Sequence, residues 1–119
     1  MNGKLKNENT DRFFRAILGL ENVDECYDFF EDLCTVSELQ AMTQRFHVAR
    51  LLDEGKTYLE ISAETGASTA TISRINKCLE YGSDGYRTVL SRLHELADES
   101  ASEQTERENT EDADDSRLS

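Results

Sequence analysis

Seven residues near the middle of the chain have the side chains that DNA contact requires. They are Ser68, Thr69, Ala70, Thr71, Ser73, Arg74 and Lys77. Their small hydroxyl and methyl groups can approach base edges and thymine methyls, and the two basic side chains can contact guanine or phosphate. A solvated helix face is the alternative interpretation. The stretch holds no acidic residue before Glu80, which is unusual for plain solvation, so we treat these seven as candidate DNA-binding residues.

The cysteines and histidines form no pattern typical of catalysis or metal binding. These residues are Cys26, Cys34, Cys78, His47 and His94. An odd number of widely spaced cysteines fits neither a disulfide framework nor a paired-thiol zinc site. No nucleophile lies at motif spacing from a histidine, and the sequence has no phosphate-binding glycine loop. We therefore expect no enzyme activity, no metal and no other cofactor, and we expect buried or half-buried free thiols.

The elements that position the seven residues are predicted to be helices. Apolar residues repeat at spacings of three and four, and the chain contains no proline, which favours an all-α domain. A first helix is expected from Asp11, with Asp11 as its cap, and a second from Val23 to Leu33. A capping box at Thr35 and Glu38 then opens a long helix. Its expected apolar stripe consists of Leu39, Met42, Phe46, Ala49 and Leu52, and it should end at Gly55.

Two short helices with a glycine between them follow, which is the signature of a helix-turn-helix. Thr57 and Glu60 form a second capping box, and Gly66 ends the first short helix after barely two turns. The second short helix starts at about Ser68. A small residue, Ser62 or Ala63, lets the helices cross closely. The aliphatic residues expected to anchor the second helix in the core are Ile72, Ile75 and Leu79.

The acidic charge lies at the two ends of the chain. The formal net charge is -12, but residues 44–94 hold six acids and seven bases, whereas residues 98–119 hold nine acids and two bases. This tail has too few apolar residues to compensate, by burial, for the conformational entropy that it would lose on folding. We expect a flexible N-terminus at 1–10, a helix-turn-helix domain at 11–97 and a disordered acidic tail at 98–119. With no apolar run of membrane-spanning length and no secretory signal, we expect a cytoplasmic protein.

Over about residues 11–96 the sequence resembles the Trp repressor superfamily, and most closely its bacterial YerC/YecD group. The resemblance rests on Thr35, Glu38, Ala41, Arg45, Leu51, Leu52, Gly55, Glu60, Gly66, Ala67, Ala70, Thr71, Ile72, Ser73, Arg74, Asn76 and Leu79. It implies an all-α, intertwined homodimer that presents two recognition helices about one DNA turn, roughly 34 Å, apart. The many phenylalanines of the first two predicted helices agree with a dimer, because one small domain cannot easily cover them.

The resemblance also implies an effector site, for which Thr35, Arg45 and Arg74 are the candidate residues. The glycine that follows the second arginine in the tryptophan-binding repressor is Ile75 here, and a pocket serine is Cys78. A branched side chain at that position should fill ligand space. We therefore expect no tryptophan binding and treat any small-molecule effector as doubtful. Arg45 is then expected to form an ion pair on the helix surface.

The function predicted from these features is a sequence-specific, dimeric DNA-binding transcription regulator, and specifically a repressor, whose partner is double-stranded DNA. The alternative is a helix-turn-helix scaffold that contacts proteins of the transcription machinery and has no operator of its own. The overall acidity and the modest number of basic residues near the motif favour this alternative. We interpret the acidic tail as a solubilising extension. The alternative is that the tail mimics DNA and competes with it for the DNA-binding face.

Overall fold

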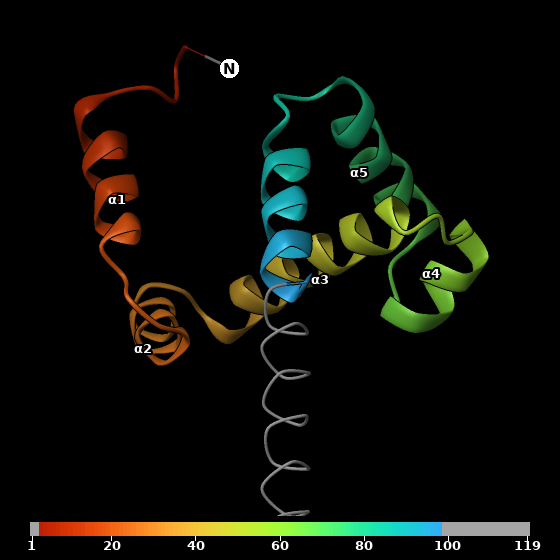
Figure 1. Cartoon of the computed structure of the whole chain (residues 1–119), viewed down its shortest axis with the longest axis horizontal. Helices are drawn as coiled ribbons and strands as arrows, with labels where there is room; N and C mark the ends of the chain where they lie inside the picture. Colours follow the sequence, from red (N-terminus) through yellow and green to blue (C-terminus); the bar gives the residue numbers. More distant parts are fainter. Residues whose placement is uncertain (1–2, 99–119) are drawn as a thin grey trace, which may run out of the picture. The chain divides into compact units, whose positions relative to one another are not determined.

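A computed structural model describes residues 3–98, all of whose regular secondary structure is helical (Figure 1). The helices are α1 (Glu8–Leu18), α2 (Val23–Leu33), α3 (Val36–Asp53), α4 (Tyr58–Thr65) and α5 (Thr69–Tyr81). A further helical stretch covers residues 85–98. The chain divides into two compact units, Met1–Asn76 and Lys77–Ser119, with the boundary inside α5. The all-α prediction is confirmed, whereas residues 99–119 of the predicted tail lie outside the described residues.

Asparagine side chains start the first two helices. Asn7 Oδ1 accepts a hydrogen bond from the Thr10 amide at 2.9 Å, so α1 begins at Glu8. The prediction that Asp11 caps this helix is wrong, because Asn7 satisfies the free amides one turn earlier and Asp11 lies inside α1. Asn22 caps α2 in the same way, accepting from the Glu25 amide at 2.9 Å. The bounds predicted for α2 are confirmed.

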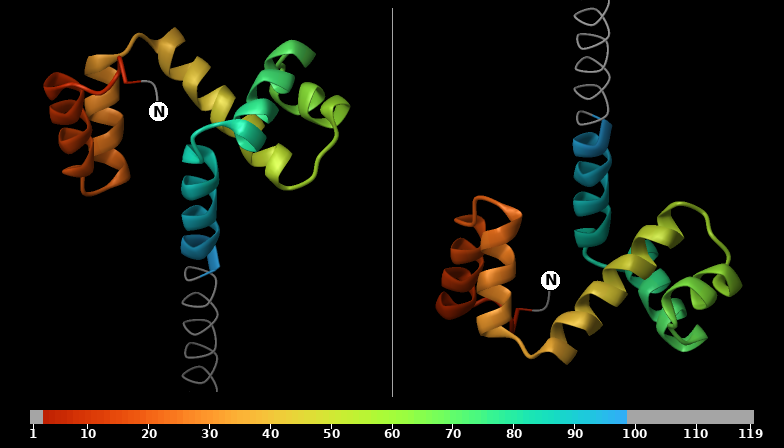
Figure 2. Two further views of the ribbon diagram at one scale, coloured as in Figure 1. Left: turned by 90° about the horizontal axis from the view of Figure 1, so that it is seen from above. Right: turned by 90° about the horizontal axis from the view of Figure 1, so that it is seen from below.

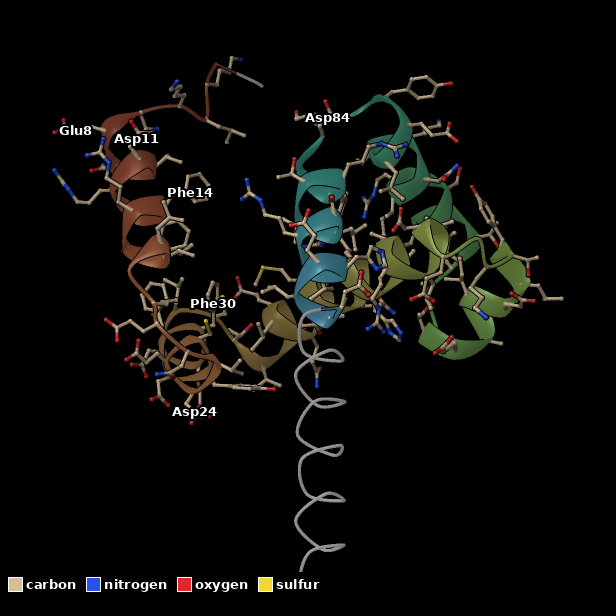
Figure 3. All side chains as sticks on the ribbon, viewed as in Figure 1. Glu8, Asp11, Phe14, Asp24, Phe30 and Asp84 are labelled. Atoms are coloured by element: carbon tan, nitrogen blue, oxygen red, sulfur yellow. The ribbon has the colours of Figure 1, made fainter. Side chains whose placement is uncertain are left out.

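Neither α1 nor α2 contains a fully buried residue. Their phenylalanine rings contact one another, with centroids 6.3 Å apart for Phe13 and Phe29 and 5.4 Å apart for Phe29 and Phe30. Phe14 and Phe30 project from these two helices in Figure 3. Phe14 is 55% exposed and Leu18 is 83% exposed. The pair of helices therefore keeps a large apolar surface uncovered in the single chain.

Both ends of α3 lie where the sequence predicted them. Thr35 Oγ1 accepts from the Glu38 amide at 3.1 Å, and Glu38 Oε1 accepts from the Thr35 amide at 3.0 Å, which completes the predicted capping box. Gly55 follows the helix with a φ of 85°, in the left-handed region. Its amide donates to the Leu52 carbonyl and the Lys56 amide donates to the Leu51 carbonyl, which is a Schellman arrangement. The predicted end of the helix is thereby confirmed.

The apolar stripe predicted for α3 is only partly correct. Ala49 is fully buried as predicted, but the other buried residues of α3 are Val48 and Leu51. The remaining predicted members, Leu39, Met42, Phe46 and Leu52, are half-buried. Periodicity selected one apolar side of α3, whereas Val48 and Leu51 lie on another, against which the two short helices pack. Figure 2 shows α4 and the first part of α5 beside the C-terminal half of α3.

Candidate nucleic-acid interface

The turn between α4 and α5 depends on Gly66. This residue has φ 74° and ψ 4°, and its amide donates to the Ser62 carbonyl at 2.9 Å. A β-carbon makes the left-handed conformation unfavourable, so a glycine is the natural residue here. The prediction that Gly66 ends the first helix of the motif is confirmed.

Three side-chain hydrogen bonds hold this turn in shape. Ser62 Oγ donates to the Ala67 carbonyl at 2.9 Å, and Thr65 Oγ1 donates to the Ile61 carbonyl at 2.7 Å. Thr65 Oγ1 also accepts from the Ala67 amide at 3.1 Å. Ser62 is thus more than the small residue that the sequence suggested. The role of Thr65 was missed, although a threonine just before a helix-ending glycine is a recognisable signal for such bonding.

A compact apolar core fixes the first part of α5 beneath the turn. Ile61 and Ile72 are fully buried, and Ala67 and Ile75 are 3% and 2% exposed. Fully burying an isoleucine side chain contributes about 1.5–3 kcal/mol. The predicted anchoring of α5 by Ile72 and Ile75 is confirmed, and Leu79, in the second unit, is also buried.

The opposite face of α5 carries the predicted DNA-binding residues. Thr69, Ala70, Arg74 and Lys77 are exposed, whereas Thr71 and Ser73 are half-buried. At about 100° per residue, positions 69, 70, 73, 74 and 77 share an arc of about 140°. This face holds two cationic side chains, and the only acid of α5, Glu80, falls on it about 15 Å along the helix from Ala70. It therefore has the composition and the exposure that contact with a phosphate backbone and base edges requires.

Ser68 and Thr71 hydrogen-bond to each other at the start of α5. Ser68 Oγ accepts from the Thr71 amide at 3.2 Å and donates to Thr71 Oγ1 at 3.0 Å. A serine hydroxyl has one hydrogen to donate, and this bond uses it. Ser68 is therefore the N-terminal cap of α5, and its hydroxyl has no free donor.

Polar side chains of α3 hold the C-terminal end of α4. Gln44 Nε2 donates to the Thr65 carbonyl at 3.1 Å, and His47 Nε2 lies 3.8 Å from Glu64 Oε1. Beside these contacts is a groove of about 580 Å³, lined by Gln40, Ala41, Thr43, Gln44, His47, Glu64 and Thr65. Sequence reasoning missed this clamp, because residues about twenty positions apart give no local signal.

The three candidate effector-binding residues occupy different environments. Thr35 is committed to the capping box and lines an α2–α3 cavity of about 390 Å³ whose lining includes neither Arg45 nor Arg74. Along α3, Thr35 and Arg45 are about 15 Å apart, given ten residues at 1.5 Å each. Arg45 is half-buried and Arg74 is exposed. The ion pair expected for Arg45 is absent, since it pairs with no carboxylate among residues 3–98.

The cysteines differ from the prediction. All three are free, but Cys26 and Cys78 are exposed and only Cys34 is half-buried. Cys78 lies one turn after Arg74, so it falls on the outer side of α5, not with Ile75. Within residues 3–98 no group of three His, Cys, Asp or Glu side chains is arranged to hold a metal ion.

The capping box of α3 has an electrostatic consequence. The hydrogen bond from the Thr35 backbone amide, assisted by the Thr35 side chain, holds the pKa of the Glu38 carboxyl below its usual range. Hydrogen bonds to the ionised form stabilise that form. The carboxylate therefore stabilises the start of α3 at neutral pH, beside the site proposed for an effector.

The two short helices, their left-handed turn and the exposed basic face of α5 define a helix-turn-helix protein of the class found in DNA-binding regulators. The chain belongs to the Trp repressor family, since the family model for the Trp repressor protein matches residues 8–94. Members of this family are regulators, not enzymes. The resemblance inferred from sequence is thereby confirmed.

Relatives support the family and its fold. The uncharacterized protein YerC of Bacillus subtilis (strain 168) is 52% identical over 99 residues, covering 83% of this chain and 95% of YerC. A TrpR like protein from Eubacterium eligens has 55% identity and a TM-score of 0.76, covering 78% of this chain and 96% of that one. For a candidate Trp repressor from Staphylococcus aureus the identity is 49% and the TM-score 0.76, covering 79% and 95%.

One further property concerns membranes. Among the helices described between residues 3 and 98, none is both long and apolar enough to cross a lipid bilayer.

Proposed function

We propose that this protein is a sequence-specific transcription regulator that binds double-stranded DNA as a homodimer and represses the genes whose operators it occupies. The outer face of α5 carries this proposal, because it exposes Arg74 and Lys77 among small side chains and has no acid before Glu80, near the end of the helix. The buried Ile72 and Ile75 hold that face rigidly against the rest of the motif. A recognition helix must be presented in this way to enter a major groove.

Unburied apolar side chains on α1, α2 and the start of α3 support the dimer. Those at least half exposed include Phe14, Leu18, Val23, Tyr27, Leu33 and Val36. Soluble monomers rarely expose contiguous apolar patches of more than a few hundred Å². A second copy would cover this surface and present two copies of α5 to one duplex. Family membership supports the same arrangement.

The distribution of charge supports specific over indiscriminate binding. The whole chain has a net charge of -12, whereas the exposed face of α5 is positive. Phosphates are therefore repelled by most of the surface and attracted at one face. We expect weak non-specific binding, and we expect specific contacts to supply most of the affinity. A DNA partner agrees with a cytoplasmic location.

Selection of sheared genomic DNA on the purified full-length protein, at about 0.15 M salt, tests the proposal. Sequencing the retained fragments should give one discrete, two-fold symmetric motif, with half-site centres about 34 Å apart. Retention of no DNA, or of DNA without a shared motif, would refute sequence-specific regulation by the protein alone. Repeating the selection with a cell extract fraction of small molecules tests whether an effector is required.

The second candidate function is a scaffold that binds a protein of the transcription machinery. It is favoured by α4, which contains Glu60 and Glu64 and no basic residue, although first helices of such motifs cross a phosphate backbone. On this reading a purified partner is captured by the protein in the absence of DNA. Substituting Arg74 and Lys77 with alanine separates the two functions, because DNA binding should be lost and protein capture through α4 should remain.

A further inference from the structure

The exposed face of α5 offers a restricted chemistry for reading base edges. Asparagine and glutamine read adenine through two hydrogen bonds, and acidic side chains accept from cytosine. From Thr69 to Lys77, none of these residue types lies on the arc formed by Thr69, Ala70, Ser73, Arg74 and Lys77, and Glu80, which does, is about 15 Å along the helix from Ala70. Asn76 is half-buried and lies just outside this arc, between Thr69 and Ile72. From Thr69 to Lys77, only methyl groups, hydroxyls and two cations remain on this arc for recognition.

Capping removes two further side chains from recognition. The single hydroxyl hydrogen of Ser68 is donated to Thr71 Oγ1, which itself is half-buried. Both therefore set the start of α5. The exposed side chains closest to that start are Thr69 and Ala70, and the first residues of a recognition helix are those that reach base edges. Both present a methyl group.

Resting on the proposed function, we infer that each half-site is read through a thymine methyl by Ala70, assisted by Thr69, and through one guanine by Arg74. Ala70 and Arg74 are four residues apart on one side of α5, so their Cα atoms are separated by about 6 Å along the helix. Base pairs rise by about 3.4 Å. The thymine and the guanine should therefore lie within about two base pairs of each other in the same half-site.

Base analogues test this inference on the operator that genomic selection yields. Replacing the contacted thymine by deoxyuridine removes only its methyl group, which should weaken binding about fourfold for one buried methyl equivalent. Replacing the guanine by 7-deazaguanine removes the N7 acceptor that a two-pronged arginine contact needs. Loss of the guanine contact should weaken binding by about fivefold to 160-fold. Full-length wild-type protein is used in every titration.

Variants assign each contact to its residue. Ala70→Gly should bind thymine and uracil operators equally, and comparing the two operators cancels any general effect of glycine on the helix. Arg74→Ala should lose discrimination between guanine and 7-deazaguanine. Ala16→Gly is the matched control, because it makes the same change at an exposed alanine of α1, and its preference among operators should equal that of the wild type.

The possible outcomes separate this inference from the proposed function. Failure to select any motif overturns the proposed function and the inference with it. A discrete motif whose binding is insensitive to both analogues overturns the inference alone. An Ala16→Gly variant that also loses the preference for thymine over uracil overturns it, since the loss in Ala70→Gly would then not report a contact of the Ala70 methyl group. Sensitivity to deoxyuridine that disappears in Ala70→Gly supports it.

Discussion

Substitution of Gly66 by alanine isolates the backbone requirement of the turn. The residue has a φ of 74°, and a β-carbon built there meets no atom within 4 Å. The cost is therefore conformational and not steric. For a residue with a β-carbon, the left-handed region costs about 1–2 kcal/mol of conformational free energy in the folded state. Alanine also lowers the conformational entropy of the unfolded chain, which stabilises the folded state by about 0.4–1 kcal/mol. We expect Gly66→Ala to lower the free energy of unfolding by about 1 kcal/mol, and Gly66→Asn by less, because asparagine tolerates this conformation.

Urea denaturation at one fixed protein concentration measures this difference, since self-association makes stability depend on concentration. Gly55→Ala is the matched control, with a φ of 85° and similar open space but a position outside the turn. It should lose about as much stability. Because no atom is displaced, operator affinity of Gly66→Ala should stay within about twofold of the wild type under native conditions. The reasoning fails if Gly66→Ala equals the wild type in stability, or if Gly66→Asn is the less stable variant.

Three more substitutions test the dimer, the DNA contact and the capping box. Leu18→Lys should weaken self-association in sedimentation equilibrium. The control Leu59→Lys changes a residue that is 82% exposed on α4, and it should leave self-association unchanged. If both variants behave alike, the interface does not lie on α1 and α2. Lys77→Ala should weaken DNA binding for all sequences and reduce the salt slope of the dimer by about 1.8, or about 0.9 for each subunit; an unchanged slope excludes a phosphate contact. Glu38 has a lowered folded-state pKa, so its stabilisation is complete above the unfolded pKa of about 4.3 and is lost as the pH falls through the folded value. The stability advantage of the wild type over Glu38→Gln should therefore shrink in acid, and an advantage that persists there contradicts the assignment.

Features that depend on a few neighbouring residues could be predicted from the sequence. The capping boxes of α3 and α4 and the left-handed Gly66 are of this kind, because each is satisfied within three or four positions. The start of α1 was mispredicted although it is also local. Asn7 and Asp11 are both good caps one turn apart, and the choice between them depends on whether the intervening turn is stable, which the pattern alone does not decide.

Features that depend on contacts between distant residues could not be predicted. The bond from Gln44 to the Thr65 carbonyl joins residues 21 positions apart, and neither side chain is unusual for a helix surface. In the candidate interface, the sequence identified the exposed face of α5. It did not show which residues of that face cap the helix and which remain available to contact DNA. That Ser68 serves as a cap became apparent from its two hydrogen bonds to Thr71.

The misjudged stripe of α3 has a functional consequence. At about 100° per residue, Val48 and Leu51 lie nearly opposite Met42 and Phe46, so α3 is apolar on two sides. The helix-turn-helix covers the first side, where Val48 and Leu51 are buried, while on the second side Ala49 is buried but Met42 and Phe46 are half-buried in the single chain. A helix with two apolar sides has no strong amphipathic signature, and periodicity then selects either side. If a second copy covers the Met42 side, one rigid helix joins the dimer contact to the recognition motif, and the spacing of the two α5 helices is set by how α3 packs on both sides.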